Sequence, residues 1–332
     1  MSYFPSISVI MSVFNGELYL EKSIESILSQ SYKDFEFIII DDSSNDSTSQ
    51  ILEQYSHDNQ VKIITNTNNI GLTKSLNIGL KTAKGKYIAR QDADDISLEN
   101  RLRIQKEFLD SNENIGGVGT SNHYINKKGD ILSTVNRESS EITTRWRLLF
   151  GNPIMHSSIM FRKNLVISIG GYKEIFNRSQ DYDLWSQLIT TSDIVQLPDV
   201  LIKYRKHQNS VSYTSDSEQL NNSISISKSN IENLLGQSVN TDFIKILRLR
   251  LDRNPNKSEL IATIDLLDKL AVRFVKKNKL NIRYANKIHK RTCLMIYKII
   301  QKYHINKSVK SFILLQAFII RLKFWKSIFQ LN

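Results

Sequence analysis

Short apolar runs alternate with helical patterns over the first third of the chain. Two apolar runs predict buried strands at residues 7–14 and 35–40, and two further strands are predicted at residues 61–64 and 86–90. The segments between and after them place apolar side chains on one side of a helix, which predicts helices at about residues 16–28, 47–55, 72–83 and 97–109. Strands and helices that alternate at this spacing predict an α/β fold, with a parallel sheet covered on both faces.

Polar clusters follow three of the predicted strands. They are Asn15-Gly16, Asp41-Asp42 and the Asp-Ala-Asp-Asp sequence at residues 92–95. In parallel sheets, ligands bind beyond the carboxyl ends of the strands. We therefore expect one crevice to collect the three clusters.

The rest of the chain has a less regular and then a helical pattern. Residues 111–215 contain paired glycines, and a helix is predicted at residues 181–190. Helical patterns continue from about residue 215 to the C-terminus, with a polar break near residues 253–257. We expect two domains, an α/β domain at 1–215 and a mainly helical region at 216–332.

The composition is that of a folded protein with a sizeable core. The 332 residues are 40% hydrophobic and 23% charged, which excludes a disordered or collagen-like chain. Cys293 is the one cysteine, so an internal disulfide and a multi-thiolate zinc site are excluded, and a reducing compartment fits best. We expect neither a signal peptide nor a membrane span, because the N-terminus has no basic leader and no apolar stretch is long enough.

The net charge of +12 is concentrated near the C-terminus. Residues 241–332 contain 21 Lys and Arg against 5 Asp and Glu, whereas residues 1–240 contain 24 against 28. From Lys269 onward there are 16 basic residues and no acidic one. This asymmetry indicates an anionic partner, a membrane surface or nucleic acid, with a solvated basic helix face as the alternative.

The acidic clusters are candidate binding sites. Close carboxylates at residues 92–95 repel one another unless a cation lies among them, which suits Mg²⁺ or Mn²⁺. The alternative is the start of a helix, which favours acidic residues, with Asp95 as N-cap. Asp41-Asp42 allow a nucleotide contact or an exposed loop with Asx turns.

Five segments resemble family 2 glycosyltransferases in their order along the chain. They are ISVIMSVFNGELYLEKSIESILSQSYKDFEFIIIDDSSNDST, NNIGLTKSLNIGLKTAKGKYIARQDADD, NPIMHSSIMFR, GGY and SQDYDLW, and they lie within residues 6–213. The resemblance implies the GT-A fold, a Rossmann-like mixed sheet flanked by helices. It also implies an inverting enzyme that uses a nucleotide sugar and Mg²⁺ or Mn²⁺.

The resemblance implies a nucleotide site at the ends of the strands. It assigns the base pocket to Ser12, Val13 and Phe14, the base contact to Asp42, and the ribose contact to Asp92. Uracil is the usual base, so UDP is the expected nucleotide.

The resemblance also implies a metal ligand and a catalytic base. Asp94 is the expected ligand of the metal that bridges the diphosphate, and Asp181 stands where the family has its base. Gln180-Asp181 replaces the usual Glu-Asp pair, and Asp183 is a weaker candidate for the base. An acidic residue at the start of a helix is the alternative for either aspartate.

The segment Tyr204-Arg205-Lys206-His207 resembles the closing loop of the family. The resemblance implies that Arg205 meets phosphate charge and that His207 reaches the metal or the diphosphate. A solvated loop histidine is the alternative for His207.

The C-terminal end has an amphipathic pattern. Phe318, Leu322, Trp325 and Phe329 fall on one side of a helix, with basic residues among them. Such a helix binds a membrane interface, or else it packs on the catalytic domain or on a second subunit of a homo-oligomer. We expect a cytoplasmic protein bound peripherally to the inner face of the cell membrane, and no nucleic-acid partner, because no nucleic-acid module is visible.

The expected function is glycosyl transfer in the biosynthesis of a polysaccharide such as capsule or O-antigen. A hexose or N-acetylhexosamine would move from a UDP-sugar to a hydroxyl of a glycan or polyprenyl-diphosphate-linked acceptor. The alternative is a non-catalytic relative that binds a nucleotide and acts as an interaction protein. The presence of Asp42, Asp92, Asp94 and Asp181 favours the enzyme.

Overall fold

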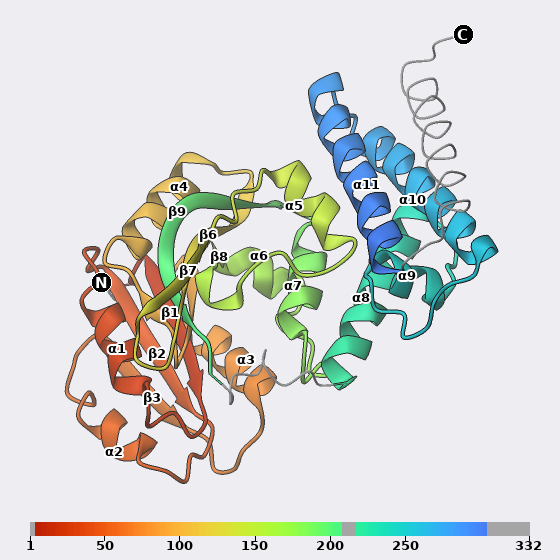
Figure 1. The fold of residues 1–332 in the computed structure, drawn as a ribbon. Helices are drawn as coiled ribbons and strands as arrows, with labels where there is room; N and C mark the ends of the chain where they lie inside the picture. The colour runs from red at the N-terminus through yellow and green to blue at the C-terminus, as the bar shows by residue number, and fades with distance from the viewer. Residues whose placement is uncertain (1–3, 208–216, 304–332) are drawn as a thin grey trace. The chain divides into compact units, whose positions relative to one another are not determined.

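The computed structural model describes residues 4–207 and 217–303. Two compact units are seen (Figure 1). The N-terminal unit comprises Met1–Thr144 and Asn152–Asn222, and the C-terminal unit comprises Arg145–Gly151 and Ser223–Asn332. The expected domain boundary after residue 215 stays a prediction, because compactness alone does not show that either part folds by itself.

A nine-stranded sheet forms the centre of the N-terminal unit (Figure 1). Its strands lie in the order β3-β2-β1-β4-β8-β6-β9-β5, and β7 pairs with β6. The strands are β1 Ile7–Val13, β2 Phe35–Asp41, β3 Val61–Thr65, β4 Tyr87–Asp92, β5 Ile96–Ser97, β6 Ile115–Ile125, β7 Ile131–Val135, β8 Met160–Arg162 and β9 Asp193–Arg205. The sheet is mixed, because β1 to β4 are parallel whereas β8 runs antiparallel to β4 and β6.

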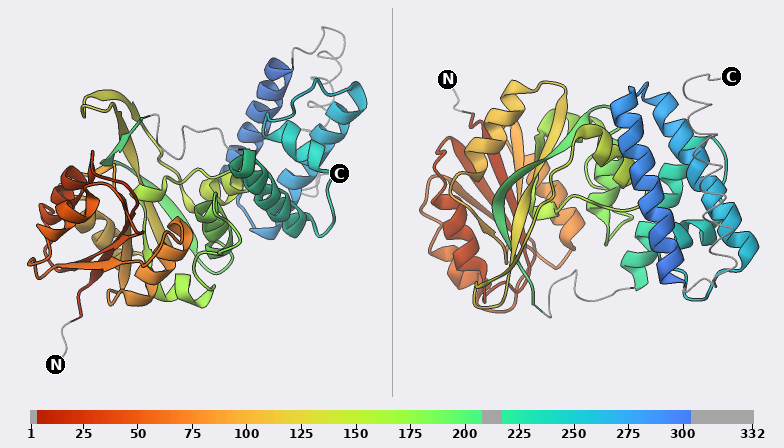
Figure 2. Two further views of the ribbon diagram at one scale, coloured as in Figure 1. Left: turned by 90° about the horizontal axis from the view of Figure 1, so that it is seen from below. Right: turned by 45° about the horizontal axis from the view of Figure 1, so that its top comes forward.

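Helices cover both faces of the parallel half of the sheet. Helix α1 (Leu20–Leu28), the short α2 (Thr48–Glu53) and α4 (Arg101–Ser111) pack on the face that carries Val9 and Met11. Helix α3 (Leu72–Thr82) packs on the opposite face. The two layers of helices are visible in Figures 1 and 2. The structure confirms the predicted α/β arrangement of this region.

Helix α3 approaches the sheet closely because Gly79 has no side chain. A Cβ atom built at Gly79 would lie 2.5 Å from Cγ2 of Ile10 on β1. Real Cβ atoms essentially never come so near another heavy atom, so a larger residue here would push α3 away from the strand.

The two longest strands lie in the region whose sequence pattern is least regular. Strand β6 contains three glycines and the polar run Thr120-Ser121-Asn122, yet all three polar residues are buried. It pairs with β9 in parallel along most of its length, with register shifts near Ile115 and Ser121. Both strands were missed by the sequence analysis, because buried glycine and polar residues carry no periodic apolar signal.

Helix α4 begins four residues later than the sequence pattern predicts. Its N-cap is Asn100, and residues 96–97 form β5 instead of the first turn of the helix. The expected role of Asp95 as N-cap is therefore wrong. Asp95 is fully buried and accepts a hydrogen bond from the backbone N–H of Arg205 at 2.9 Å.

Shorter elements connect β7, β8 and β9. They are α5 (Glu141–Leu148), the 3₁₀ turn η1 (His156–Ser158), α6 (Lys163–Ser168) and α7 (Gln180–Leu188). Helix α7 confirms the predicted helix near residues 181–190. The predicted apolar residues Leu184, Trp185 and Leu188 are buried.

The C-terminal unit is built from helices. They are α8 (Ser217–Leu235), which begins in the N-terminal unit, α9 (Thr241–Leu247), α10 (Lys257–Lys277) and α11 (Ile282–Lys302). The ring of Trp146 packs edge-on against Phe150 and Phe274, each at 5.1 Å between centroids. No helix within residues 4–207 and 217–303 is long and apolar enough to cross a membrane.

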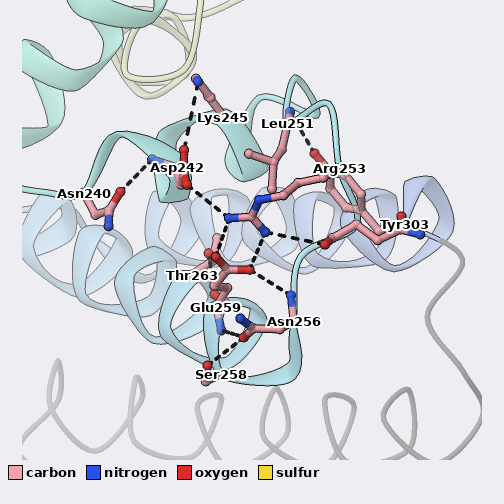
Figure 3. Close-up of polar contacts among 11 residues, drawn as sticks. Asn240, Asp242, Lys245, Leu251, Arg253, Asn256, Ser258, Glu259, Thr263 and Tyr303 are labelled. Atoms are coloured by element: carbon pink, nitrogen blue, oxygen red, sulfur yellow. Dashed lines mark hydrogen bonds and ion pairs between the residues drawn. The ribbon is translucent and has the colours of Figure 1, made fainter.

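The polar break predicted near residues 253–257 lies between α9 and α10 (Figure 3). Asn256 and Glu259 form a capping box at the start of α10. Arg253 joins the two helices, with one N–H group 2.6 Å from Glu259 and 3.2 Å from Asp242. Further breaks at residues 236–240 and 278–281 divide the helical region into separate helices. The predicted amphipathic pattern at Phe318, Leu322, Trp325 and Phe329 lies outside the described residues.

Candidate functional site

The carboxyl ends of β1, β2 and β4 lie side by side, as the sequence pattern predicts. Strand β1 is central, with Val13 opposite Asp41 of β2 and Ser12 opposite Asp92 of β4. The sheet therefore brings the three polar clusters that follow these strands to one edge.

The expected base-pocket residues end β1. Val13 is buried, Ser12 is half-buried, and the side chain of Phe14 is 48% exposed. A large exposed aromatic ring beside polar loops is available to a planar ligand such as a nucleobase.

The loops after β1 and β2 are bound to each other. The backbone N–H groups of Asn15 and Gly16 donate to the hydroxyls of Ser44 and Thr48, at 3.0 and 2.8 Å. The Asn15 side chain in turn accepts from the N–H of Asn45 at 2.9 Å. These reciprocal bonds fix the position of the edge next to Phe14.

Asp42 is buried and its carboxylate organises the segment before α3. It accepts hydrogen bonds from the Asn66 side chain at 2.8 Å and from the backbone N–H groups of Ile70 and Gly71 at 2.9 and 2.8 Å. Two carboxylate oxygens have about four acceptor positions, so capacity for one further donor remains. The base contact expected of Asp42 stays a prediction.

A network of buried polar side chains forms hydrogen bonds with the backbone of the acidic loop at residues 92–95. The side-chain amide of Gln91 donates to the backbone carbonyls of Asp92 and Asp95, at 3.2 and 2.9 Å. The Arg101 guanidinium donates a hydrogen bond to the side-chain oxygen of Gln91 at 3.0 Å, which fixes the orientation of Gln91. It also donates to the Arg90 carbonyl at 2.7 Å. The side chains of Gln91 and Arg101 are buried, so the loop is held rigidly by β4 and α4.

Arg205 holds the same loop from β9. Its side chain is 1% exposed, and its Nε–H donates to the carbonyl of Asp94 at 2.9 Å. The same guanidinium donates to the carbonyls of Asn126 and Lys127 and lies over the ring of Tyr19 at 4.5 Å. The observed contacts position Asp94, and the expected contact of Arg205 with phosphate stays a prediction.

Asp94 and His207 form a pair of candidate metal ligands. The Nε2 atom of His207 lies 2.8 Å from Oδ2 of Asp94, and the His207 ring packs near Tyr19 with 5.1 Å between centroids. Among the residues that the structure describes, no three His, Cys, Asp or Glu side chains cluster as a ready-made metal site. A carboxylate and an imidazole fit a divalent cation that completes its shell with phosphate oxygens and water.

The neighbours of Asp94 are electrostatically crowded. Burial raises the pKa of Asp95 well above its ordinary value, and the charges of Asp94 and Asp92 act in the same direction. Burial also raises the pKa of Asp92, although Arg90, 2.6 Å from its carboxylate, opposes this.

Asp181, the expected catalytic base, lies in the first turn of α7. Its Oδ2 atom accepts a hydrogen bond from the Asn152 side chain at 2.7 Å, and its Oδ1 atom accepts from the N–H of Tyr182 at 2.7 Å. Burial raises the pKa of Asp181 to about 6, the charge of Asp92 adds to this rise, and the two hydrogen bonds oppose it. The carboxylate is therefore ionised at neutral pH and remains basic enough to accept a proton.

An aromatic cluster accompanies Asp181. The Nε2 atom of His156 lies 2.9 Å from the hydroxyl of Tyr172, and the His156 ring also packs against Trp185. Burial lowers the pKa of His156 well below its ordinary value, with Arg90 acting in the same direction, so its imidazole is neutral at pH 7. Asp181 and Asp92 both act on the pKa of Tyr172, which places these groups within electrostatic range of one another.

Asp183 has the contacts of a structural residue. It is 3.5 Å from the ammonium group of Lys173 and accepts from Gln187 at 2.5 Å. The Asp183 carboxylate is engaged by the Lys173 ammonium and the Gln187 amide, whereas Asp181 accepts only from uncharged donors. Asp181 is therefore the better candidate to accept a proton from an acceptor hydroxyl.

Several residues of the site had no assigned role in the sequence analysis. Asn152 and Asn66 bind the carboxylates of Asp181 and Asp42, and Tyr19 lies against Arg205 and His207. Their partners are far away in the sequence, so only tertiary contacts reveal them. The Asn-Pro pair at Asn152 was the one available signal, because it marks a turn in the segment that resembles the family.

The fold is of the GT-A type that glycosyltransferases share. Among solved structures, S. aureus TarS in complex with UDP-GlcNAc matches with a TM-score of 0.60 over 90% of this chain and 91% of that chain, at 18% identity. The mannosyltransferase PcManGT from Pyrobaculum calidifontis, solved with GDP-Man and Mn²⁺, matches with a TM-score of 0.50 over 100% of this chain and 89% of its own, at 16% identity. At these identities the likeness shows the fold.

Sequence comparison shows the family. Residues 8–170 match the family described as Glycosyl transferase family 2. A glycosyltransferase of Haemophilus influenzae is 34% identical over 68% of this chain and 73% of its own length. The O-antigen biosynthesis glycosyltransferase WbnJ of Escherichia coli is 36% identical over 61% of this chain and 81% of its own length. The chain belongs to glycosyl transferase family 2, and the expected family and GT-A fold are confirmed.

Proposed function

We propose that this glycosyltransferase moves a hexose or N-acetylhexosamine from a UDP-sugar to a hydroxyl of a glycan acceptor, with inversion at the anomeric carbon. The observation that carries the proposal is the environment of Asp181. This carboxylate is half-buried, is oriented by Asn152, and lies within the electrostatic influence of Asp92. The reaction requires a general base that lies close to the bound nucleotide sugar, and Asp181 lies close to the proposed nucleotide-binding edge of the sheet.

The proposed chemistry is a single displacement. Asp181 accepts the proton of the acceptor hydroxyl while that oxygen attacks the anomeric carbon of the donor. The bond between this carbon and the diphosphate oxygen breaks, and UDP leaves with the bonding electron pair. Attack from the side opposite the leaving group converts an α-linked donor into a β-linked product, and no covalent enzyme intermediate forms.

The proposed donor site lies at the ends of β1, β2 and β4. Phe14 and the strand end at Ser12 and Val13 accept the base, and Asp42 and Asp92 contact uracil and ribose. Support comes from the exposed ring of Phe14 and from the fixed loops beside it. TarS, which shares the fold, is known in complexes with UDP-GlcNAc and with UDP, which favours a uridine nucleotide.

A divalent cation, Mg²⁺ or Mn²⁺, belongs to the proposed mechanism. Asp94 and His207 would hold it, and when bound it offsets the negative charge that develops on the departing diphosphate. Arg205 keeps the Asp94 backbone in position through the hydrogen bond at 2.9 Å. The Mn²⁺ in the structure of PcManGT supports a metal in a protein of this fold.

The proposed pathway is polysaccharide biosynthesis, as for the relative WbnJ, whose name assigns it to O-antigen. The acceptor is a glycan, or a glycan on a polyprenyl diphosphate. A lipid-linked acceptor requires the enzyme to work at a membrane surface, and the basic C-terminal region supports a peripheral location at the inner face of the cell membrane.

Calorimetric titration with UDP tests the donor site. We expect binding in the presence of Mn²⁺, its loss after addition of EDTA, and at least a tenfold weaker metal-dependent affinity in Asp94→Asn. Asp58→Asn is the matched control, since Asp58 lies in the turn before β3, away from this edge. Metal dependence that is unchanged in Asp94→Asn would remove this residue from the metal site.

A transfer assay with a panel of UDP-sugars and acceptors tests the reaction itself. Product with an inverted anomeric configuration, identified by NMR, is expected from the wild type and not from Asp181→Asn. Nucleotide binding without any turnover would favour the alternative of a non-catalytic interaction protein.

A further inference from the structure

Helix α11 presents a basic face without acidic residues. Arg283, Lys287, Lys290 and Lys298 follow one another at spacings of four, three and eight residues, which keeps them on one side of the helix, and all four are exposed. The helix contains no Asp or Glu in its 21 residues. One side of α11 is thus uniformly positive.

Two large apolar side chains are exposed within the same face. Leu294 is 51% exposed and Tyr297 is 56% exposed. Lys290 lies one turn before Leu294, and Lys298 lies one turn after it, so the lysines flank the apolar pair. We call the surface formed by Arg283, Lys287, Lys290, Leu294, Tyr297 and Lys298 the α11 face.

The opposite side of the helix is committed to the core. Ala285, Ile288, Ile296 and Ile299 are buried, and α11 packs on α9 and α10 within the C-terminal unit. This packing fixes the rotation of the helix about its axis. The α11 face is therefore presented outward by the fold of the unit itself.

Charge discriminates between the possible occupants of the α11 face. The C-terminal segment 304–332 contains five Lys and Arg and no acidic residue, so its charge opposes contact with this face. A second copy of α11 would carry the same repulsive charge. An anionic surface suits both the basic residues of the face and those of the following segment.

We propose that the α11 face docks on an anionic lipid membrane. The basic side chains contact the lipid phosphates, and Leu294 and Tyr297 enter the interface between headgroups and acyl chains. Tyrosine is well suited to this depth, because its ring is apolar and its hydroxyl remains hydrated. The apolar pair favours a membrane over nucleic acid, since a phosphate backbone gives an exposed leucine nothing to bury against.

This proposal rests on the peripheral membrane location given in the proposed function and identifies the surface that would bind the membrane. It does not depend on the identity of the donor or on the metal. It can therefore fail while glycosyl transfer is confirmed, and the reverse also holds.

Flotation of the full-length protein with liposomes tests the proposal. We expect co-flotation with vesicles of phosphatidylcholine and phosphatidylglycerol at low salt, and none with phosphatidylcholine alone. The double variant Lys290→Gln, Lys298→Gln should bind about 25-fold more weakly, if each lysine contributes the roughly fivefold typical near an anionic surface. Leu294→Ser with Tyr297→Ser should release the protein at a lower salt concentration than the wild type requires.

The matched control is Lys62→Gln with Lys81→Gln, two exposed lysines on β3 and α3 of the N-terminal unit. It makes the same change in net charge away from the α11 face and should keep wild-type flotation. Unchanged melting temperatures show that the variants are folded, and unchanged transfer to a soluble acceptor shows that their site is intact.

Four results would overturn the proposal. They are no flotation of the wild type, undiminished flotation of both α11 variants, an equal loss in the Lys62 and Lys81 control, and release of bound protein by equimolar RNA. A change of oligomeric state in the α11 variants, measured by sedimentation, would assign the face to a second subunit instead.

Discussion

The two compact units use polar residues in opposite ways. The N-terminal unit buries Arg90, Gln91, Arg101 and Arg205 in hydrogen-bond networks beneath its acidic edge. In the C-terminal unit, the buried polar residues among those described are small hydroxyl side chains, such as Thr263 and Thr292, which bond to carbonyls of their own helices. Its basic residues lie mostly on the outside.

This difference shows which unit carries the chemistry. Burying an arginine or a glutamine costs free energy that apolar packing would not, so a fold keeps such groups where a backbone has to be held in one position. The loop at residues 92–95 is held in this way. The C-terminal helices need no such precision and are stabilised by apolar contacts.

The largest expected effect comes from Asp181→Asn. We expect kcat to fall about 100- to 10,000-fold, because a neutral amide cannot accept the acceptor proton. Nucleotide affinity should be unchanged. Steady-state kinetics with titrated UDP check this, and Asp183→Asn is the control, which should keep most of the activity. Near-normal transfer by Asp181→Asn would move the base to another residue.

The second prediction concerns the buried network. Arg101→Met should lower the free energy of unfolding by about 3 kcal/mol, because it removes the buried hydrogen bonds that the guanidinium donates to the Gln91 side chain and the Arg90 carbonyl. Arg103 lies two residues after Arg101 on the same helix but outside this network, with a side chain 43% exposed and an ion pair to Glu107. Arg103→Met should cost about 0.3–0.5 kcal/mol. Urea unfolding measures both free energies. Equal losses in the two variants would contradict the proposed difference between the buried network and the exposed ion pair.

The third prediction concerns the pH dependence. Activity should rise with pH through about 6, since Asp181 works as a base only when it is ionised and its pKa is raised to about 6. Asn152→Ala removes a hydrogen bond that stabilises the ionised form, so the inflection of kcat should move to higher pH. Asn152→Ser, which restores a donor, should move it part of the way back. An unshifted profile would show that Asn152 does not act on the base.

The smallest effect is expected in the C-terminal unit. Arg253→Gln breaks an exposed ion-pair network with Glu259 and Asp242, at 2.6 and 3.2 Å. We expect a slight fall in the midpoint of thermal unfolding that disappears at high salt, and no change in transfer. A loss as large as that of Arg101→Met would mean that the two units do not differ as described.

The two halves of the sheet differ in how well their strands can be predicted from the sequence. Strands β1 and β2 have nearly continuous apolar runs, and β3 and β4 follow at regular spacing, so these strands and the acidic clusters at residues 41–42 and 92–95 can be predicted from local pattern alone. Strand β6 contains glycines and buried polar residues, and β9 contains buried polar residues such as Gln196 and Arg205, whose burial depends on neighbouring strands. Asp95 shows the same limit, because a helix cap and a buried acceptor have the same local sequence signal.

The sequence by itself determined the family, the parallel strands, the acidic edge and the position of Asp181, since these depend on residues that are close together in the chain. The tertiary structure alone decided how these groups are held. Arg205 and His207 contact Asp94 because β9 pairs with β5, which is far from it in the sequence. Asn152 binds Asp181 because the loop after α5 lies beside the first turn of α7. Local residue order specifies which groups are present, whereas long-range packing sets the distances and the burial on which their chemistry depends.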